Sequence, residues 1–497
     1  MSNYLCFDLG TTKIKSCLLD NNGNIIYFSS IDAKTYYDDG IYQKPEEYYN
    51  AIISEINIIK AKHPQTFKKA EVLICSGQMG GLLGIDENWD VVFPWTHSLD
   101  SRCNNHISRI EKSIGELIRK KSGGYPFGPG KMVWIKKDFP ALYKRIKKFI
   151  NLHSYISGKL CNIKSDKAFI DYSCLALFGL ADVINNKWEK DICGHLEIDI
   201  EKLPKICKPF EIVGNIDKNF FGTENDISVM VGCGDQLAGF FGAGVIKNGD
   251  IVDVTGTYTV LGYCTSKFKS DMKNKVFSSF YSGIDNIFYQ MATIAAGGYT
   301  YGWFIDKFNY KPWIKFEDYR DSKGLYFIPY LGGRYHPFQP YYDGSWLGIT
   351  WGHTLDDFYV SLLEGFGYEF NFYLKFLKEL NNLSKDDLKE IKVIGGGARD
   401  NFWSNIKANI LNLKYIKLTK IPFEIMGLYL IAKYRDDLKY GFNKMVENKI
   451  IYIEDIILPQ KDKVNLYEKN KNKYIKIINK LDKIYYNIKN YGVNPIP

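Results

Sequence analysis

The sequence predicts an α/β protein built from two similar halves. Apolar strands at residues 4–9, 72–76 and 391–394 alternate with helical stretches, and this alternation is typical of layered α/β folds. A strand, a Gly-Thr turn and a second strand open the chain, and the same pattern returns at residues 251–263. This internal echo indicates a repeated unit. A chain of 497 residues also suits two cores better than one.

The first half begins with three expected strands, at residues 4–9, 14–19 and 25–29, joined by glycine-containing turns. Pro45 opens a helix that continues to Ile59, since proline is well suited to a first helical turn. The remaining elements expected in this half are strands at 72–76 and 229–233, mostly helical stretches at 103–122 and 129–160, and a helix at 235–244.

The second half begins after a polar break at residues 247–250, which places the two domains at 1–246 and 247–497. Its strand–turn–strand unit at 251–263 is followed by expected helices at 355–380 and 402–411. The strand at 391–394 ends in three glycines, and a Lys- and Tyr-rich helix is expected from 467 to 491.

Composition excludes several classes of function. The net charge of +9 is spread along the chain without a recognised nucleic-acid module, so no nucleic-acid partner is expected. The ten cysteines lack any Cys-x-x-Cys pair, which argues against structural zinc and favours a reducing cytoplasm. Neither a signal peptide nor an apolar run long enough to span a bilayer is apparent, so no membrane partner is expected.

Two Gly-Thr turns are candidate phosphate sites. Glycine lets a phosphate approach the backbone N–H groups, and threonine adds a hydroxyl. Gly10-Thr11-Thr12 and Gly256-Thr257 offer this chemistry in both halves, with Lys15 adding charge beside the first. Asp8, at the end of the first strand, is a candidate for holding Mg²⁺ through water. Each turn alone is more simply a hairpin, but their matching positions in the two halves favour the phosphate interpretation.

Asp235 is the candidate catalytic base. It follows two glycines at a strand end and begins a helix, where its carboxylate is placed to accept a hydroxyl proton during phosphoryl transfer. Gln236 is placed to bind another hydroxyl. Asp235 is equally suited to capping its helix, and both roles are compatible. The Gly395-Gly396-Gly397 turn provides a third close backbone approach for a ligand.

Taken together, these motifs resemble those of the FGGY family of carbohydrate kinases, in the actin-like ATPase superfamily, over nearly the whole chain. In order, they are Asp8-Leu-Gly-Thr-Thr, Tyr42-Gln-Lys-Pro-Glu-Glu, Ser76-Gly-Gln-Met, Trp95 with Asp100 and Arg102, Gly232-Cys-Gly-Asp-Gln, Gly256-Thr257, Ala296-Gly-Gly with Trp303, Tyr326-Phe-Ile-Pro-Tyr-Leu-Gly-Gly-Arg, Glu364-Gly and Gly395-Gly-Gly-Ala-Arg. Their shared order makes the resemblance specific.

The resemblance implies two actin-like (ribonuclease H-like) domains with ATP and Mg²⁺ in the cleft between them. Asp235 matches the catalytic base and Asp8 the acid near Mg²⁺. The positions that match phosphate or nucleotide contacts are Thr11, Thr12, Thr257, Gly298, Gly396 and Gly397, and Lys15 and Gly256 of the two turns complete the candidate nucleotide site. The positions that match sugar contacts are Gln78, Met79, Asp100, Arg102 and Gln236.

Departures from the family pattern concern the acceptor. Gly80 stands where xylulose kinases usually carry a histidine, and the spacing from Trp95 to Asp100 is stretched. A ketopentose such as xylulose is the first expectation, and Arg102 keeps an aldonate such as gluconate open because arginine binds carboxylates. The alternatives of another class are an actin-like ATPase and a non-catalytic sugar sensor. A homodimer is also left open by the resemblance.

Overall fold

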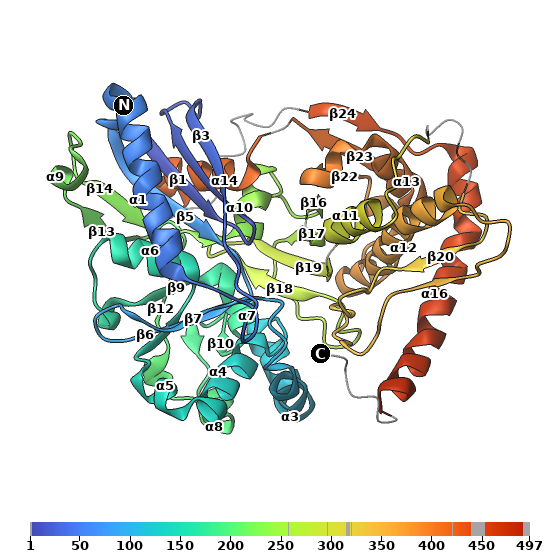
Figure 1. Cartoon of the computed structure of the whole chain (residues 1–497), viewed down its shortest axis with the longest axis horizontal. Coiled ribbons are helices and arrows are strands. Elements are labelled where there is room, and N and C mark those ends of the chain that lie inside the picture. Colours follow the sequence, from blue (N-terminus) through green and yellow to red (C-terminus); the bar gives the residue numbers. More distant parts are fainter. Residues whose placement is uncertain are drawn as a thin grey trace.

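The computed structural model describes residues 2–256, 258–295, 297–314, 319, 321–419, 421–438 and 453–490. Two seven-stranded sheets form its centre, one in each half of the chain, and helices cover them (Figure 1). The sheets lie side by side, with the N-terminal strands in blue and the second set running from yellow to red.

The first sheet has the strand order β13-β14-β5-β1-β2-β3, with β15 paired to β5. Its strands are β1 (Asn3–Leu9), β2 (Lys13–Leu19), β3 (Ile25–Asp32), β5 (Ala70–Gly77), β13 (Ile212–Ile216), β14 (Ile227–Met230) and β15 (Cys233–Gly234). The first three are an antiparallel meander, whereas β5 runs parallel to β1 and β14 parallel to β5. The ends of β1, β5 and β15 therefore meet at one edge.

The second sheet has the order β18-β19-β17-β16-β22-β23-β24. Its strands are β16 (Ile251–Thr255), β17 (Thr259–Thr265), β18 (Ser278–Tyr281), β19 (Phe288–Ile294), β22 (Glu390–Ile394), β23 (Lys414–Leu418) and β24 (Ile453–Ile457). Here too an antiparallel meander leads into two parallel pairings, β16 with β22 and β22 with β23. The repeat expected from the two Gly-Thr hairpins is thus present in the strand order.

Smaller sheets and the helices complete the two layers. The remaining strands are β4 (Tyr42–Gln43), β6 (Leu82–Ile85), β7 (Val91–Thr96), β8 (Lys148–Ile150), β9 (Phe169–Asp171), β10 (Ala181–Asp182), β11 (Lys187–Trp188), β12 (Lys205–Cys207), β20 (Tyr326–Ile328) and β21 (Ser345–Leu347). The helices are α1 (Pro45–Lys62), α2 (Pro64–Phe67), α3 (Asn104–Ser122), α4 (Phe127–Asp138), α5 (Pro140–Arg145), α6 (Leu152–Leu160), α7 (Leu175–Phe178), α8 (Lys190–His195), α9 (Lys218–Phe221), α10 (Asp235–Gly242), α11 (Gly297–Lys307), α12 (Leu355–Asn381), α13 (Asn401–Leu411), α14 (Phe423–Lys433), α15 (Arg435–Leu438) and α16 (Lys461–Asn490).

Two glycines let the halves pack against each other through α10 and α14. A Cβ at Gly242 would lie 1.9 Å from the carbonyl oxygen of Phe423, and one at Gly427 would lie 1.8 Å from that of Ala238. Only glycine permits so close a helix crossing. Tyr429 of α14 then packs edge-on against Tyr4 of β1, at 5.2 Å between ring centroids. The C-terminal half therefore contributes a helix to the core behind the first sheet (Figure 1).

The stretch 129–160, expected to be mostly helical, forms α4, α5 and α6, with the unpredicted strand β8 between the last two. Two predicted elements differ from the structure. The strand expected at 229–233 is divided into β14 and β15 at Gly232, which adopts φ +77° and where a Cβ would lie 1.9 Å from the carbonyl oxygen of Cys75. The tail helix begins at Lys461, earlier than expected, and residue 491 lies outside the described residues.

Among the described residues, no helix combines the length and the apolar character needed to cross a bilayer.

Candidate active site

The first Gly-Thr turn and Asp235 meet at the same edge of the first sheet. In the strand register Asp8 lies beside Ser76, and Ser76 lies beside Cys233. Asp235 follows Cys233 by two residues and is the first residue of α10. Parallel neighbours bring their carboxyl ends together, which is where α/β proteins usually bind ligands. The predicted catalytic base, Asp235, and the predicted Mg²⁺ acid, Asp8, therefore share one edge.

Asp8 is a buried carboxylate with two partners. Its Oδ1 accepts a hydrogen bond from the Ser76 hydroxyl at 2.8 Å, and its Oδ2 lies 3.0 Å from Lys15 Nζ. Lys15 Nζ also binds Glu424 of α14 at 2.9 Å. Burial lowers the pKa of Lys15, but the Asp8 and Glu424 carboxylates outweigh this effect and raise it overall. Lys15, predicted to add charge near a phosphate, thus links a carboxylate from each half.

Asp235 is half-buried in surroundings that disfavour its charged form. Burial raises the pKa of Asp235 to about 8, and the negative charge of Asp8 adds to the rise. The hydrogen bond from the Gln236 backbone N–H, 2.8 Å long, acts in the opposite direction. A carboxyl group with a pKa close to neutrality is well matched to proton transfer.

The residues after β5 support the Gly-Thr turn. The Gln78 amide donates to the Gln43 side-chain oxygen, and Gln43 donates in turn to the Thr11 carbonyl oxygen at 2.9 Å. Gln78 is almost fully buried. Met79 packs over Gly234, where a Cβ would meet its sulfur at 2.5 Å. The two predicted sugar-binding residues therefore stand between the phosphate turn and Asp235.

Gly80 cannot simply be exchanged for the histidine expected in xylulose kinases. Its φ of +80° is a left-handed conformation that L side chains rarely adopt. A Cβ at this position would lie 3.4 Å from the Cβ of Ser98. That is an ordinary contact distance, so the backbone conformation rather than a lack of space favours glycine at this point.

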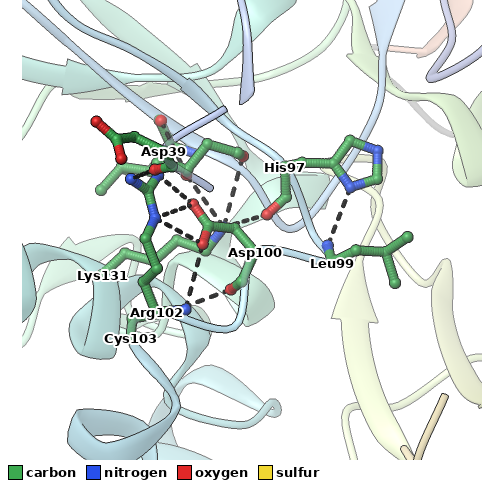
Figure 2. Close-up of polar contacts among 9 residues, drawn as sticks. Asp39, His97, Leu99, Asp100, Arg102, Cys103 and Lys131 are labelled. Atoms are coloured by element: carbon green, nitrogen blue, oxygen red, sulfur yellow. Dashed lines mark hydrogen bonds and ion pairs between the residues drawn. The ribbon is translucent and has the colours of Figure 1, made fainter. Parts of the chain in front are cut away.

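Asp100 and Arg102 bind each other (Figure 2). Arg102 Nη2 lies 2.6 Å from Asp100 Oδ2, and Nε donates to both carboxylate oxygens. The guanidinium also donates to the Asp39 carbonyl oxygen and stacks over Trp134 at 4.7 Å. These two predicted substrate residues therefore neutralise each other.

A buried lysine, Lys131, binds the residues that begin the loop before Asp100. Lys131 Nζ donates to the His97 carbonyl oxygen at 2.7 Å and to the Thr96 hydroxyl at 3.0 Å (Figure 2). His97 Nδ1 accepts from the Leu99 backbone N–H at 3.0 Å, and burial lowers the pKa of His97 to about 4. His97 thus supports the loop, as does Trp95, which is fully buried.

A cavity of about 100 Å³ lies between this loop and the second half of the chain. Segments 98–104 and 332–340 form its walls together with Phe127 and Lys131. The Tyr335 hydroxyl donates to the Ser98 carbonyl oxygen at 3.3 Å across the boundary. Asp100 lines this cavity, whereas the Arg102 side chain is turned toward Asp39 and Trp134.

The predicted nucleotide glycines come together at the matching edge of the second sheet. The Gly298 N–H donates to the Gly256 carbonyl oxygen at 2.9 Å. A Cβ at Gly397 would lie 2.3 Å from Thr255 Cγ2, whereas no atom of the described chain lies within 4 Å of a Cβ at Gly396. The predicted contact Thr257 lies outside the described residues. Thr11 and Thr12 occupy the corresponding turn of the first half, with Thr12 exposed.

Two groups of residues at the site were not predicted. Glu424 joins it from α14, 409 positions away from its partner Lys15. Ser173 accepts a hydrogen bond from the Gly234 N–H, directly before Asp235, at 2.8 Å. Its neighbour Asp171 is a charged residue within the apolar run 168–180, and that isolated charge was the available signal.

Comparison with known proteins agrees with this geometry. Residues 3–242 match the FGGY family of carbohydrate kinases, N-terminal domain, and residues 253–422 match its C-terminal domain. A xylulose kinase of Staphylococcus epidermidis (strain ATCC 35984) is 26% identical over 480 residues, covering 93% of this chain and 94% of that protein. A gluconokinase of Bacillus subtilis (strain 168) is 25% identical over 461 residues, covering 87% and 88%.

The fold has solved counterparts. The crystal structure of ligand-bound xylulose kinase from Lactobacillus acidophilus superimposes with a TM-score of 0.87 at 19% identity, covering 98% of this chain and 100% of that one. Together with the two domain matches, this confirms the predicted fold class, an α/β protein of two domains. The exact boundary at residues 246 and 247 stays a prediction. Matched by both domains of the family, the chain belongs to the FGGY family of carbohydrate kinases, which transfer a phosphoryl group from ATP to an alcohol group of a sugar.

Proposed function

We propose that the protein phosphorylates a hydroxyl of a small neutral sugar, a ketopentose such as xylulose, with Asp235 as the general base. The observation that carries this proposal is the placement of Asp235 at the start of α10, beside Asp8, with a pKa raised to about 8 by burial. Near neutral pH such a carboxyl group can accept a proton from an attacking hydroxyl and release it afterwards.

The surroundings of Arg102 support a neutral acceptor over an aldonate. Arg102 already donates from Nε and Nη2 to Asp100 and from Nη1 to Asp39. These contacts use three of its five N–H groups, and the Asp100 carboxylate offsets its charge. Its side chain also does not line the cavity beside Asp100, so it is poorly placed to attract the carboxylate of a gluconate-type acceptor there. Gln78, Met79, Asp100 and Gln236 remain the proposed contacts of the sugar, with Arg102 holding Asp100.

On the nucleotide side, we assign the phosphates to the two Gly-Thr turns. Thr11, Thr12, Gly256 and Thr257 are their proposed contacts, and Gly298, Gly396 and Gly397 are those of the rest of the nucleotide. The open space at Gly396 and the tight packing at Gly397 suit a ligand lying against the backbone. Lys15 supplies positive charge beside the first Gly-Thr turn.

The residues at the first edge also fit Mg²⁺. Asp8, Asp235 and Glu424 gather around the single ammonium group of Lys15, so negative charge is in excess. Magnesium prefers oxygen ligands and retains several waters, so Asp8 would hold it through water. The ion would neutralise charge on the transferring phosphates.

Several wider assignments are also part of this proposal. We assign sugar binding and the base to residues 1–246 and nucleotide binding to residues 247–497. The ten free cysteines fit a reducing cytoplasm. A homodimer is proposed from the family resemblance alone, and sedimentation of the purified protein tests it.

The decisive experiment measures ADP release with Mg·ATP across a panel of ketoses, aldoses, polyols and aldonates. We expect one neutral sugar to give a strong signal, and Asp235→Asn to lower kcat by about 10²–10⁴-fold with ATP binding nearly unchanged. Asp462→Asn, at the exposed start of α16, is the matched control and should behave like the wild type.

Each part of the proposal has its own contrary result. A signal confined to aldonates would contradict the neutral acceptor but leave Asp235 in its role. Full turnover in Asp235→Asn would remove Asp235 as the base. ATP hydrolysis without any acceptor would point to an ATPase, and silence with ATP bound would point to a sensor.

A further inference from the structure

The buried triad His153–Asp171–Ser173 lies directly behind the candidate base, and the proposed function gives it no role. We propose that Ser173, held by Asp171 and His153, is a positioning residue that fixes the strand-to-helix junction at Gly234 and so aims the Asp235 carboxylate. This inference rests on the proposed function, because it gives Asp235 the role of base.

The triad begins with Asp171, whose carboxylate is fully buried at the end of β9. Its Oδ1 lies 2.8 Å from His153 Nε2. Its Oδ2 accepts from the Ser173 backbone N–H at 2.8 Å and from the Ser173 hydroxyl. A carboxylate removed from water requires such a set of donors, so Asp171 and its neighbours form one rigid unit.

The direction of the serine hydrogen bonds follows from their chemistry. The Gly234 backbone N–H can only donate, so the Ser173 hydroxyl oxygen accepts from it at 2.8 Å. Its hydroxyl hydrogen is then available to Asp171, which as a carboxylate can only accept. A serine oriented in this way presents a fixed acceptor to the main chain immediately before Asp235.

The junction itself has little other freedom. Strand β15 is two residues long and pairs with β5, Cys233 opposite Ser76 and Gly234 opposite Gly77. Met79 covers Gly234 on one side. Ser173 holds the N–H of the residue that caps α10, so a shift of that residue would carry Asp235 with it. Misplacing a reacting group by about 1 Å can cost about 100-fold in rate.

A metal site is the competing interpretation of the same residues. His153, Asp171 and Cys174 each offer one ligand atom, and these atoms lie within 4.8 Å of one another. Both Asp171 oxygens are, however, already used by N–H and O–H donors. Burial also raises the pKa of Cys174 well above its usual value, which disfavours the thiolate that a metal binds. The hydrogen-bonded unit accounts for the geometry without an ion.

The test uses the full-length protein and the sugar that is most active in the panel. Ser173→Ala should lower kcat by about 10- to 100-fold and change KM for ATP and sugar by less than about two-fold, because the loss falls on the transition state. Ser173→Thr, which keeps the hydroxyl, should restore most of kcat. In an Asp235→Asn background, Ser173→Ala should have almost no further effect, since both act through the same carboxylate.

Ser154→Ala is the matched control. Its hydroxyl is also fully buried but has no hydrogen-bond partner among the described residues. It should therefore keep the wild-type kcat. If Ser173→Ala does not fold, Asp171→Asn takes its place with the same expected split between kcat and KM.

Wild-type kcat in Ser173→Ala, or in Asp171→Asn where that replaces it, would overturn the inference while an inactive Asp235→Asn still supports the proposed function. An equal fold-loss with and without Asp235 would also overturn it, because the effect would then be structural. Full activity in Asp235→Asn would instead overturn the proposed base itself.

Discussion

The two Gly-Thr hairpins have the same topology but place their acids differently. In the first, Asp8 lies two residues before Gly10, beside Lys15, whose side chain is 25% exposed, and Glu424, which is 31% exposed. In the second, Asp253 lies three residues before Gly256 and pairs with Lys407, with exposures of 0% and 2%. Because side chains alternate along a strand, the one-residue difference turns the two acids to opposite faces.

The comparison distinguishes the charged candidate site in the first half from a buried structural ion pair in the second half. Asp253 and Lys407 also bind the Thr255 hydroxyl, at 2.8 and 2.9 Å, and Thr255 packs against Gly395 and Gly397. This buried ion pair therefore stabilises the backbone of the glycine turn at residues 395–397. Asp8, with its partners Lys15 and Glu424, instead lies at the edge of the first sheet where Asp235 begins α10. One motif is thus used for a charged site in one half and for a rigid platform in the other.

The largest effect on stability should come from breaking the buried ion pair between Asp253 and Lys407. Lys407→Met leaves Asp253 buried without its cation and should lower the free energy of unfolding by about 3–5 kcal/mol. Urea unfolding followed by circular dichroism measures this. Lys414→Met, which removes an exposed pair with Glu390, should change stability by about 0–1 kcal/mol. Equal losses in the two variants would contradict the distinction drawn between the halves.

The charged residues around Asp8 and Asp235 should affect how the rate depends on pH. The base must be ionised, and burial and Asp8 raise the pKa of Asp235 to about 8, so kcat/KM should fall as pH drops through that value. Asp8→Asn removes a neighbouring negative charge and should move this acid limb to lower pH, in addition to lowering kcat. A pH series of initial rates measures both. A limb near the ordinary pKa of aspartate in the wild type would refute the assignment.

Lys15→Met should move the same limb the other way. Lys15 lowers the pKa of Asp235, so its loss should shift the acid limb to higher pH. Its side chain is partly exposed, and stability should change far less than in Lys407→Met. Rates and urea unfolding of the same preparation give the two values. An unmoved limb would show that Lys15 acts on Asp8 and Glu424 alone.

The smallest effect on folding is expected at Gly396, in the glycine turn of the second half. A Cβ added at Gly396 would meet no neighbouring atom of the described chain within 4 Å. Gly396→Ala should therefore keep the free energy of unfolding within about 0.5 kcal/mol of the wild-type value while raising KM for ATP. Gly397→Ala meets Thr255 at 2.3 Å and should cost about 1–3 kcal/mol. Thermal melts and ATP titrations distinguish them. An unaltered KM in Gly396→Ala would place the nucleotide elsewhere.

Local patterns located the turns and strand ends that carry the candidate site residues. Gly10, Gly256 and Asp235 follow strands where expected, because turns and strand ends are encoded by nearby residues. Strand β8, within the mostly helical stretch 129–160, was missed for the opposite reason. Strand β8 forms only because β6 lies beside it, and that pairing spans about sixty residues of chain.

The sequence by itself determined the α/β class, the repeated hairpin and the order of motifs that mark a carbohydrate kinase. Only the tertiary structure decided how the charges pair: Arg102 with Asp100 and Asp39, Lys15 with Glu424, and Ser173 with the backbone before Asp235. The physical reason is that a turn is specified by its own residues, whereas the partner of a charge depends on which distant segments pack against it. The acceptor's identity depends on those partners too, since they decide which polar groups remain free to bind it.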